Sequence, residues 1–204
     1  MIGSNNLTFK LFNFLGAPVK LNLLFLILFA IMPISYAISI FIAVMVHEMA
    51  HAFVADKKGY RVYGIEIGLF SGSASMDSNM HQSDSIPITA AGPLSNLLLL
   101  GLSTAFIPYH IYIEHFAYVN LFLFIFNILP IYPMDGGQIL RDFLMLKSRK
   151  LGIDRYKGFT ISAWVSLITS ILLTVFSLFT GYIFMAIFGG YFGYLALKDL
   201  NYIK

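Results

Sequence analysis

The sequence of 204 residues contains no cysteine and few charges, since only 11% of its residues are Asp, Glu, Lys or Arg. An average soluble domain carries about 25% charged residues. The lack of cysteine excludes a disulfide-stabilised scaffold, and 16 glycines are too few for a collagen-like chain. The chain is instead rich in apolar residues, with 58% hydrophobic and 16% aromatic residues and a mean hydropathy of +0.79. These values exclude intrinsic disorder and predict a polytopic membrane protein.

Two long stretches lack any formal charge. One has 26 residues between Lys20 and His47, and the other has 40 residues between Lys157 and Lys198. One helix needs about 20 residues to cross a bilayer. We predict an all-α polytopic membrane protein with six transmembrane helices, at about residues 21–32, 35–55, 86–107, 116–132, 159–179 and 182–197. Only Pro33 separates the first two spans, so a single kinked helix in their place is the alternative.

The placement of the basic residues decides between six spans and five. With six spans, all 13 Lys and Arg residues lie at the two ends of the chain or in the two long loops. The three opposite loops contain none. By the positive-inside rule, both termini and the long loops are then cytoplasmic. Five spans would place Lys10 and Lys20 outside, and we reject that arrangement.

Two stretches outside the spans predict other structure. Residues 7–19 mix apolar residues with Lys10 and Pro18, which indicates an interfacial strand or a short helix. Residues 60–76 combine a short alternating apolar run with glycine and serine around Gly72, and predict a small β-hairpin on the cytoplasmic face of the membrane. We expect residues 1–204 to form one domain, with a catalytic core at about 40–145 and a helix pair at about 159–197.

The second predicted span contains His47-Glu48-Met49-Ala50-His51. Positions four apart lie on one face of a helix, so both imidazoles can bind one Zn²⁺ with the glutamate beside it as a general base. The alternative is a pair of buried histidines that hydrogen-bond to neighbouring helices. Intramembrane His and Glu are energetically unfavourable and usually functional, which favours the metal site.

Zinc catalysis requires a third protein ligand and an open position, and Asp135 is the best candidate for the ligand. It follows Pro130 and Pro133, which end the fourth span, and precedes two glycines that allow close backbone approach. A helical segment is expected at residues 138–146, and its dipole favours a carboxylate at this point. The aspartate is therefore equally consistent with a simple helix N-cap.

The third predicted span contains Gly92-Pro93-Leu94-Ser95-Asn96. Glycine and proline at this depth expose backbone groups, which is tolerated only where protein or a cavity covers them. Asn96 is suited to bind a substrate strand or to hold the other two motifs together. It is equally suited to a plain interhelical hydrogen bond.

Together, the three motifs resemble those of the site-2 protease family of intramembrane zinc metalloproteases, over roughly residues 40–145. Ala55 and Gly59 continue the family pattern after the two histidines, and the elements Gly92-Pro93…Asn96 and Asn127…Pro130…Pro133…Asp135-Gly136-Gly137 also match. The resemblance implies an endopeptidase that hydrolyses peptide bonds within or near transmembrane segments, in regulated intramembrane proteolysis. It implies one Zn²⁺ bound by His47, His51 and Asp135, with Glu48 as the catalytic acid/base and Asn96 and Asn127 as substrate-positioning residues.

The chain departs from larger family members, because nothing resembles a PDZ domain between the second and third motifs and no pair of CBS domains follows the sixth span. It is similar to the minimal archaeal and sporulation-type branch. The expected partners are a transmembrane substrate and the lipid bilayer, with no nucleic acid. The expected location is a prokaryotic cell membrane, with the active site towards the cytoplasm. An extended substrate is expected to bind by strand addition along an edge of the hairpin or of the N-terminal strand. A metal transporter and a non-catalytic relative that binds membrane proteins are the alternatives.

Overall fold

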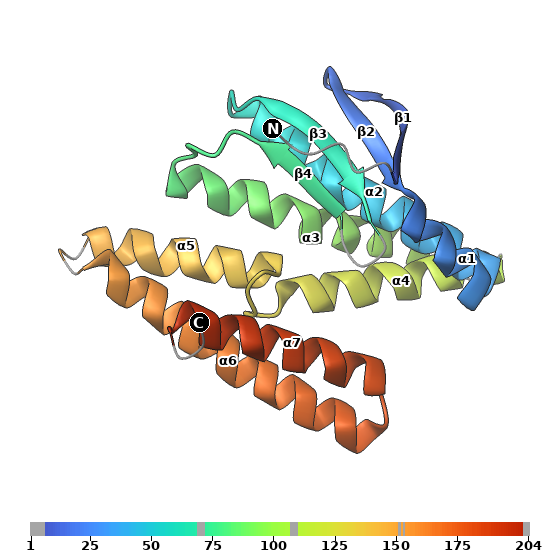
Figure 1. Ribbon diagram of the computed structural model, residues 1–204. Helices are drawn as coiled ribbons and strands as arrows, with labels where there is room; N and C mark the ends of the chain where they lie inside the picture. The colour runs from blue at the N-terminus through green and yellow to red at the C-terminus, as the bar shows by residue number, and fades with distance from the viewer. Residues whose placement is uncertain (1–6, 69–71, 107–109, 151, 153, 202–204) are drawn as a thin grey trace. The chain divides into compact units, whose positions relative to one another are not determined.

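The computed structural model describes residues 7–68, 72–106, 110–150, 152 and 154–201, and its elements are shown in Figure 1. The chain divides into two compact units. The first consists of Met1–Met80 and Ala91–Ile125, and the second of His81–Ala90 and Phe126–Lys204. Helix α3 (Gln82–Thr104) therefore contributes its beginning to the second unit and its remainder to the first.

The first unit contains a four-stranded sheet with the strand order β1-β2-β3-β4. Its strands are β1 (Thr8–Phe14), β2 (Ala17–Asn22), β3 (Val62–Ile67) and β4 (Gly72–Met76). β1 and β2 pair antiparallel, β2 and β3 pair parallel, and β3 and β4 pair antiparallel. The hairpin predicted at residues 60–76 is present as β3 and β4, while its residues 69–71 lie outside the described residues.

One face of the sheet is apolar and buried. Val19 pairs with Ile65 and Leu21 with Ile67, and all four side chains are buried, whereas Lys20 points to the other face and is exposed. Helix α2 (Ile34–Lys57) packs against β3 and β4, as Figure 1 shows. The alternating burial thus fixes the sheet on the helix that carries the two histidines.

Four described helices are long and apolar enough to cross a membrane. They are α2, α3, the helix α4 (Ile111–Ile128) and residues Tyr156–Thr180 of α6 (Arg155–Thr180). They correspond to the second, third, fourth and fifth predicted spans. Residue 107, the last residue of the third predicted span, lies outside the described residues. The sixth predicted span is helix α7 (Ile183–Asp199), which has 17 residues.

The first predicted span, residues 21–32, has a different structure. It begins in β2 and continues as a four-residue 3-10 helix, η1 (Leu23–Leu26), and a five-residue helix, α1 (Ile27–Ile31). Asn22 caps the start of η1 by accepting a hydrogen bond from the backbone N–H of Leu24, and Pro33 separates α1 from α2. This helical stretch is much shorter than the roughly 20 residues that one crossing requires, so six crossings remain a prediction.

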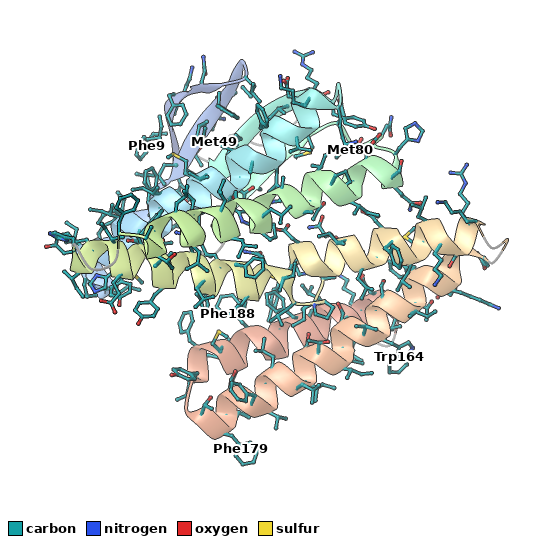
Figure 2. The ribbon with its side chains drawn as sticks, turned by 180° about the vertical axis from the view of Figure 1, so that it is seen from behind. Phe9, Met49, Met80, Trp164, Phe179 and Phe188 are labelled. Carbon is teal, nitrogen blue, oxygen red and sulfur yellow. The ribbon has the colours of Figure 1, made fainter. Side chains whose placement is uncertain are left out.

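The second unit is built on α5 (Asp135–Lys150), α6 and α7. α6 and α7 pack against each other after a turn at Gly181, which has a φ of 78°. The contact is close because Gly189 lies against Thr174, where an added Cβ would be 2.5 Å from Oγ1. Apolar side chains point outward from the pair: Phe179 is 89% exposed and is labelled near the end of α6 in Figure 2. Such a surface suits a lipid environment.

Candidate metal centre

The predicted pair of histidines lies on α2, one helical turn apart. The ring centroids of His47 and His51 are 4.7 Å apart, and these two side chains and that of Glu48 are all buried. The helix is lined by small buried residues, among them Ala43, Ala52 and Ala55, which let its neighbours approach closely. Three ionisable side chains are thus withdrawn from the surface along one stretch of helix, and burial of this kind requires compensating partners.

Gly92 of α3 faces both imidazoles. A Cβ added at this glycine would lie 2.3 Å from Nε2 of His51 and 2.5 Å from Nε2 of His47. No side chain larger than hydrogen fits there with the rings in place. The glycine therefore lets α3 pack directly against the two imidazoles, which a side chain at position 92 would displace.

Asn96, one turn further along α3, determines which nitrogen of a neutral His47 ring carries the proton. The Nδ1 atom of His47 lies 2.6 Å from the amide oxygen of Asn96. The amide nitrogen of Asn96 points elsewhere, because it donates to the side-chain oxygen of Asn120 at 3.0 Å. His47 must therefore donate from Nδ1, which leaves the lone pair of the ring on Nε2, the atom that faces Gly92.

The first residue of β4 lies against Glu48. A Cβ added at Gly72 would be 2.3 Å from Cγ and 2.5 Å from Oε1 of Glu48. Gly72 thus lets the strand reach the glutamate directly. In the sequence, the glycine and serine around this position indicate only a small hairpin, and no spacing rule points to Glu48.

The second unit carries Asp135 as the first residue of α5, where it is 9% exposed. The loop before it is held from α6: the Ser166 hydroxyl accepts a hydrogen bond of 2.6 Å from the Tyr132 backbone N–H. The Tyr132–Pro133 peptide bond is cis. The two glycines after Asp135 are needed for space, since a Cβ at Gly136 would lie 2.2 Å from the carbonyl oxygen of Ile128.

Arg141 of α5 secures the same loop from its other side. Its guanidinium carbon lies 3.6 Å from the ring centroid of Tyr132 and 4.6 Å from that of Phe159, and it forms an ion pair with Asp199 at the end of α7. Stacking and ion pairing together connect the loop with α5, α6 and α7. Sequence reasoning treated Arg141 only as one of the basic residues of a cytoplasmic loop.

The predicted site residues therefore divide between the units. His47, Glu48, His51 and Asn96 belong to the first unit, and Asn127 and Asp135 belong to the second. Asn127 lies half-buried in the last turn of α4. Asn120, which is fully buried and bonded to Asn96, was not predicted, although an asparagine within an apolar helix was a usable signal.

Comparisons with known proteins show which proteins this chain is similar to. The sequence matches the family descriptions "Peptidase M50B-like" over residues 21–136 and "Peptidase family M50" over residues 104–173. It is 30% identical to a zinc metalloprotease of Methanocaldococcus jannaschii over 192 residues, which cover 85% of this chain and 55% of the relative. It is 25% identical to the stage IV sporulation protein FB of Bacillus subtilis over 158 residues, 71% of this chain and 54% of the relative. The chain thus spans about half the length of these curated relatives.

Among solved structures, the fold is similar to that of the site-2 protease from Methanocaldococcus jannaschii. The TM-score is 0.64 at 27% sequence identity, and the alignment covers 94% of each chain. The similarity thus extends over both units and not only over the segment that carries the two histidines.

Proposed function

This chain belongs to the M50 peptidases, the site-2 protease family, and we propose that it is an intramembrane zinc endopeptidase. The observation that carries the proposal is the buried set His47, Glu48 and His51 on an apolar helix, with Gly92 packed directly against both imidazoles. Its substrates are membrane proteins that it cuts within or near a transmembrane segment.

One zinc ion would be held by His47, His51 and Asp135. The donor set fits the metal: two imidazoles and a carboxylate, all three buried, are the ligands of a catalytic zinc site with an open position. The tautomer of His47 also fits, because Nδ1 donates to Asn96 and the ring lone pair is then on Nε2, where it can bind the ion. When bound, zinc polarises a carbonyl group and lowers the pKa of a water molecule to about 7.

Glu48 is the catalytic acid/base. It takes a proton from the attacking water, whose oxygen adds to the peptide carbonyl carbon, and passes that proton to the leaving amine nitrogen when the C–N bond breaks. Asn127 donates a hydrogen bond from its amide to the oxygen of the same carbonyl group. Burial of Glu48 supports this role, since it removes the competing solvent around the proton that is transferred.

β4 binds the substrate in an extended form. Within the described part of the chain, β4 pairs only with β3, so its second edge is open to another strand. The contact between Gly72 and Glu48 supports this role, because it brings the first residue of β4 next to the proposed acid/base. A transmembrane helix hides its carbonyl groups in its own hydrogen bonds, so a substrate must unwind before it can be cut, and strand addition replaces the bonds that it loses.

The integral membrane protein adopts six spans with both termini in the cytoplasm, and its two units form one catalytic domain. The distribution of the 13 basic residues supports this orientation. The active site then opens toward the cytoplasmic side of a prokaryotic cell membrane. The archaeal and bacterial origin of the relatives supports the last point.

The proposal is tested with purified protein and a single-span membrane substrate in detergent. Glu48→Gln retains about one zinc per chain and loses cleavage by about 100-fold or more, because general acid–base catalysis typically contributes 10²–10⁴-fold. Asp135→Ala loses zinc as well as cleavage. The matched control is Glu114→Gln, a half-buried carboxylate at the start of α4 that retains both.

Cleavage by Glu48→Gln at the wild-type rate would exclude the protease mechanism. Zinc binding that is indifferent to Asp135→Ala would exclude this third ligand and leave the histidine pair in place. The transporter and the non-catalytic alternatives are not favoured by the family membership.

A further inference from the structure

Two asparagine side chains of the first unit form a buried hydrogen-bonded pair. Asn96 of α3 and Asn120 of α4 are each 0% exposed, and the amide nitrogen of Asn96 donates to the amide oxygen of Asn120 at 3.0 Å. Burying an amide in an apolar helix bundle is unfavourable unless its donors and acceptors are used. The question is what this pair does beyond holding two helices together.

Two backbone carbonyl groups fix the orientation of the pair. Asn120 donates from its amide nitrogen to the carbonyl oxygen of Phe116 at 2.9 Å, and Asn96 donates from its amide nitrogen to that of Ala43 at 3.4 Å. A carbonyl oxygen can only accept, so neither amide can be reversed without placing oxygen against oxygen. The amide oxygen of Asn96 therefore has one possible direction, toward His47.

The pair ends on a metal-ligand candidate. The Asn96 oxygen lies 2.6 Å from Nδ1 of His47, so this nitrogen carries the proton and Nε2 carries the lone pair. The order of donors and acceptors runs without interruption from the Phe116 carbonyl through Asn120 and Asn96 to His47. Every member of this row belongs to the first unit.

We propose that Asn120 is a positioning residue that acts through Asn96 to hold His47 in the form protonated at Nδ1, and thereby sets the affinity of the site for zinc. The inference rests on the proposed function. It assigns a role to Asn120, which does not touch His47. A partner that accepts from the second nitrogen of a ligating histidine orients the ring and raises its basicity, and its loss typically lowers metal affinity about 10- to 100-fold.

The same geometry favours one of the roles that the sequence leaves open for Asn96, which are substrate positioning and holding the other two motifs together. Both N–H groups of its amide are used, one by Ala43 and one by Asn120, and its oxygen is used by His47. No donor remains for a substrate carbonyl. Asn96 is therefore a positioning residue for His47, and substrate contact falls to Asn127 and to the edge of β4.

The test measures zinc affinity of the full-length protein in detergent by competition with a chelator, without any substrate. Asn96→Leu weakens zinc binding about 10- to 100-fold. Asn120→Leu weakens it less, about 3- to 10-fold, because the amide nitrogen of Asn96 still donates to the carbonyl oxygen of Ala43 in this variant. Val119→Ala is the matched control: Val119 is buried beside Asn120 on α4, and its truncation loosens packing without touching the amides. We expect its zinc affinity to equal that of the wild type.

The double variant separates positioning from plain packing. If Asn120 acts only through Asn96, then Asn96→Leu/Asn120→Leu binds zinc as weakly as Asn96→Leu alone. If the two substitutions instead caused independent packing defects, their reductions in zinc affinity would multiply in the double variant. Multiplied effects, or an unchanged affinity in Asn120→Leu, would overturn the proposal.

The outcome is distinct from that of the protease test. If the wild-type protein binds zinc but cuts no substrate, the proposed function is contradicted and the role of Asn120 is not. If the protein is an active protease and Asn120→Leu leaves its zinc affinity unchanged, only the role of Asn120 is contradicted. Wild-type protein without any affinity for zinc overturns both.

Discussion

Gly92 lets two imidazole rings keep their arrangement, because it packs directly against both of them. At position 92 the carbon of a methyl group would lie 2.3 Å from Nε2 of His51 and 2.5 Å from Nε2 of His47. These distances are far below van der Waals contact, so both rings would have to move. The glycine is thus as much a part of the site as the ligands.

We expect Gly92→Ala to abolish zinc binding while the protein stays folded. The methyl group displaces both imidazole rings, so their Nε2 atoms can no longer converge on one ion. Zinc content and thermal unfolding of the purified variant measure the two effects. Gly101→Ala is the control on the same helix, because nothing lies within 4 Å of its added Cβ. Normal zinc content in Gly92→Ala would show that the ion does not lie in front of these nitrogens.

Gly72→Ala is expected to give the opposite combination, with zinc retained and cleavage impaired. Its added Cβ would lie 2.3 Å from Cγ of Glu48, so the acid/base must move while the histidines stay. A loss of kcat of about 10-fold or more follows, because even a displacement near 1 Å can reduce catalysis by 10². Gly64→Ala on β3 is the control, since its nearest neighbour, the Pro18 carbonyl oxygen, is 3.5 Å away.

Unchanged kcat in Gly72→Ala would contradict the role of the β4 contact. Lost zinc in the same variant would show that the strand supports the metal rather than the acid/base.

For single residues, the sequence predicts which side chains carry the chemistry better than it predicts which distant residues contact them. The spacing of His47, Glu48 and His51 on one helix is a local pattern, so it predicts a metal site without knowledge of the tertiary structure. Gly72 and Asn120 are remote in sequence from the residues that they serve, and only the packing of β4 and α4 in the first unit brings out their roles. No spacing rule connects them.

Among the elements, the sheet shows where a local pattern is insufficient. The alternation in β3 and the glycine of β4 predict a hairpin, and the structure has one. The parallel pairing of β2 with β3 joins segments separated by the whole of α2, and no turn signal marks it. The apolar residues 21–32 were interpreted as a span because hydrophobic content alone does not distinguish a buried strand followed by short helices from a crossing helix.

The open end of the β3–β4 hairpin is closed by Asp77, which gives a pH prediction. Its carboxylate accepts from the Tyr63 hydroxyl and from the Arg61 backbone N–H, both at 2.7 Å. The Tyr63 hydrogen bond, supported by the Arg61 N–H, lowers the pKa of Asp77 below its ordinary 3.8, and the contact with Asp77 raises the pKa of Tyr63 above 10.0. The interaction therefore stabilises the hairpin between these two values.

This stability is lost as the pH falls through the lowered pKa of Asp77, and again as it rises through the raised pKa of Tyr63. Amide hydrogen exchange of β3 and β4 measures it. Asp77→Asn exchanges faster than wild type at neutral pH and has no further loss of protection in acid. Asp56→Asn, at an exposed aspartate near the end of α2, is the control. Equal protection from amide exchange in Asp77→Asn and the wild type would show that the hydrogen bonds of Asp77 do not stabilise the hairpin.

At the scale of the whole molecule, the natural absence of cysteine makes the orientation directly testable. Tyr182→Cys places a thiol in a turn expected outside, where Tyr182 is 65% exposed, and Arg149→Cys places one in a loop expected inside. A membrane-impermeant maleimide should label the first in intact cells and the second only after permeabilisation. The unmodified protein, which has no thiol, gives the background. The reverse pattern would contradict the orientation derived from the basic residues.

The spans themselves were the most predictable feature at this scale. Long charge-free stretches and their flanking basic residues report on length and burial in lipid, which do not depend on which helix packs on which. Four of the six predicted spans correspond to helices long enough to cross a membrane. The division into two units, with α3 contributing to both, has no counterpart in composition, because it depends on contacts between distant segments.

The open edge of β4 has a consequence for turnover. A strand bound through its backbone is held almost regardless of side chains, and each half of a cut substrate still has such a backbone. The edge that recruits the substrate would then retain the product, and release would become slower as more residues remain paired. The enzyme would be inhibited by its own longer product, and shortening that fragment by two residues at a time would restore the rate in steps.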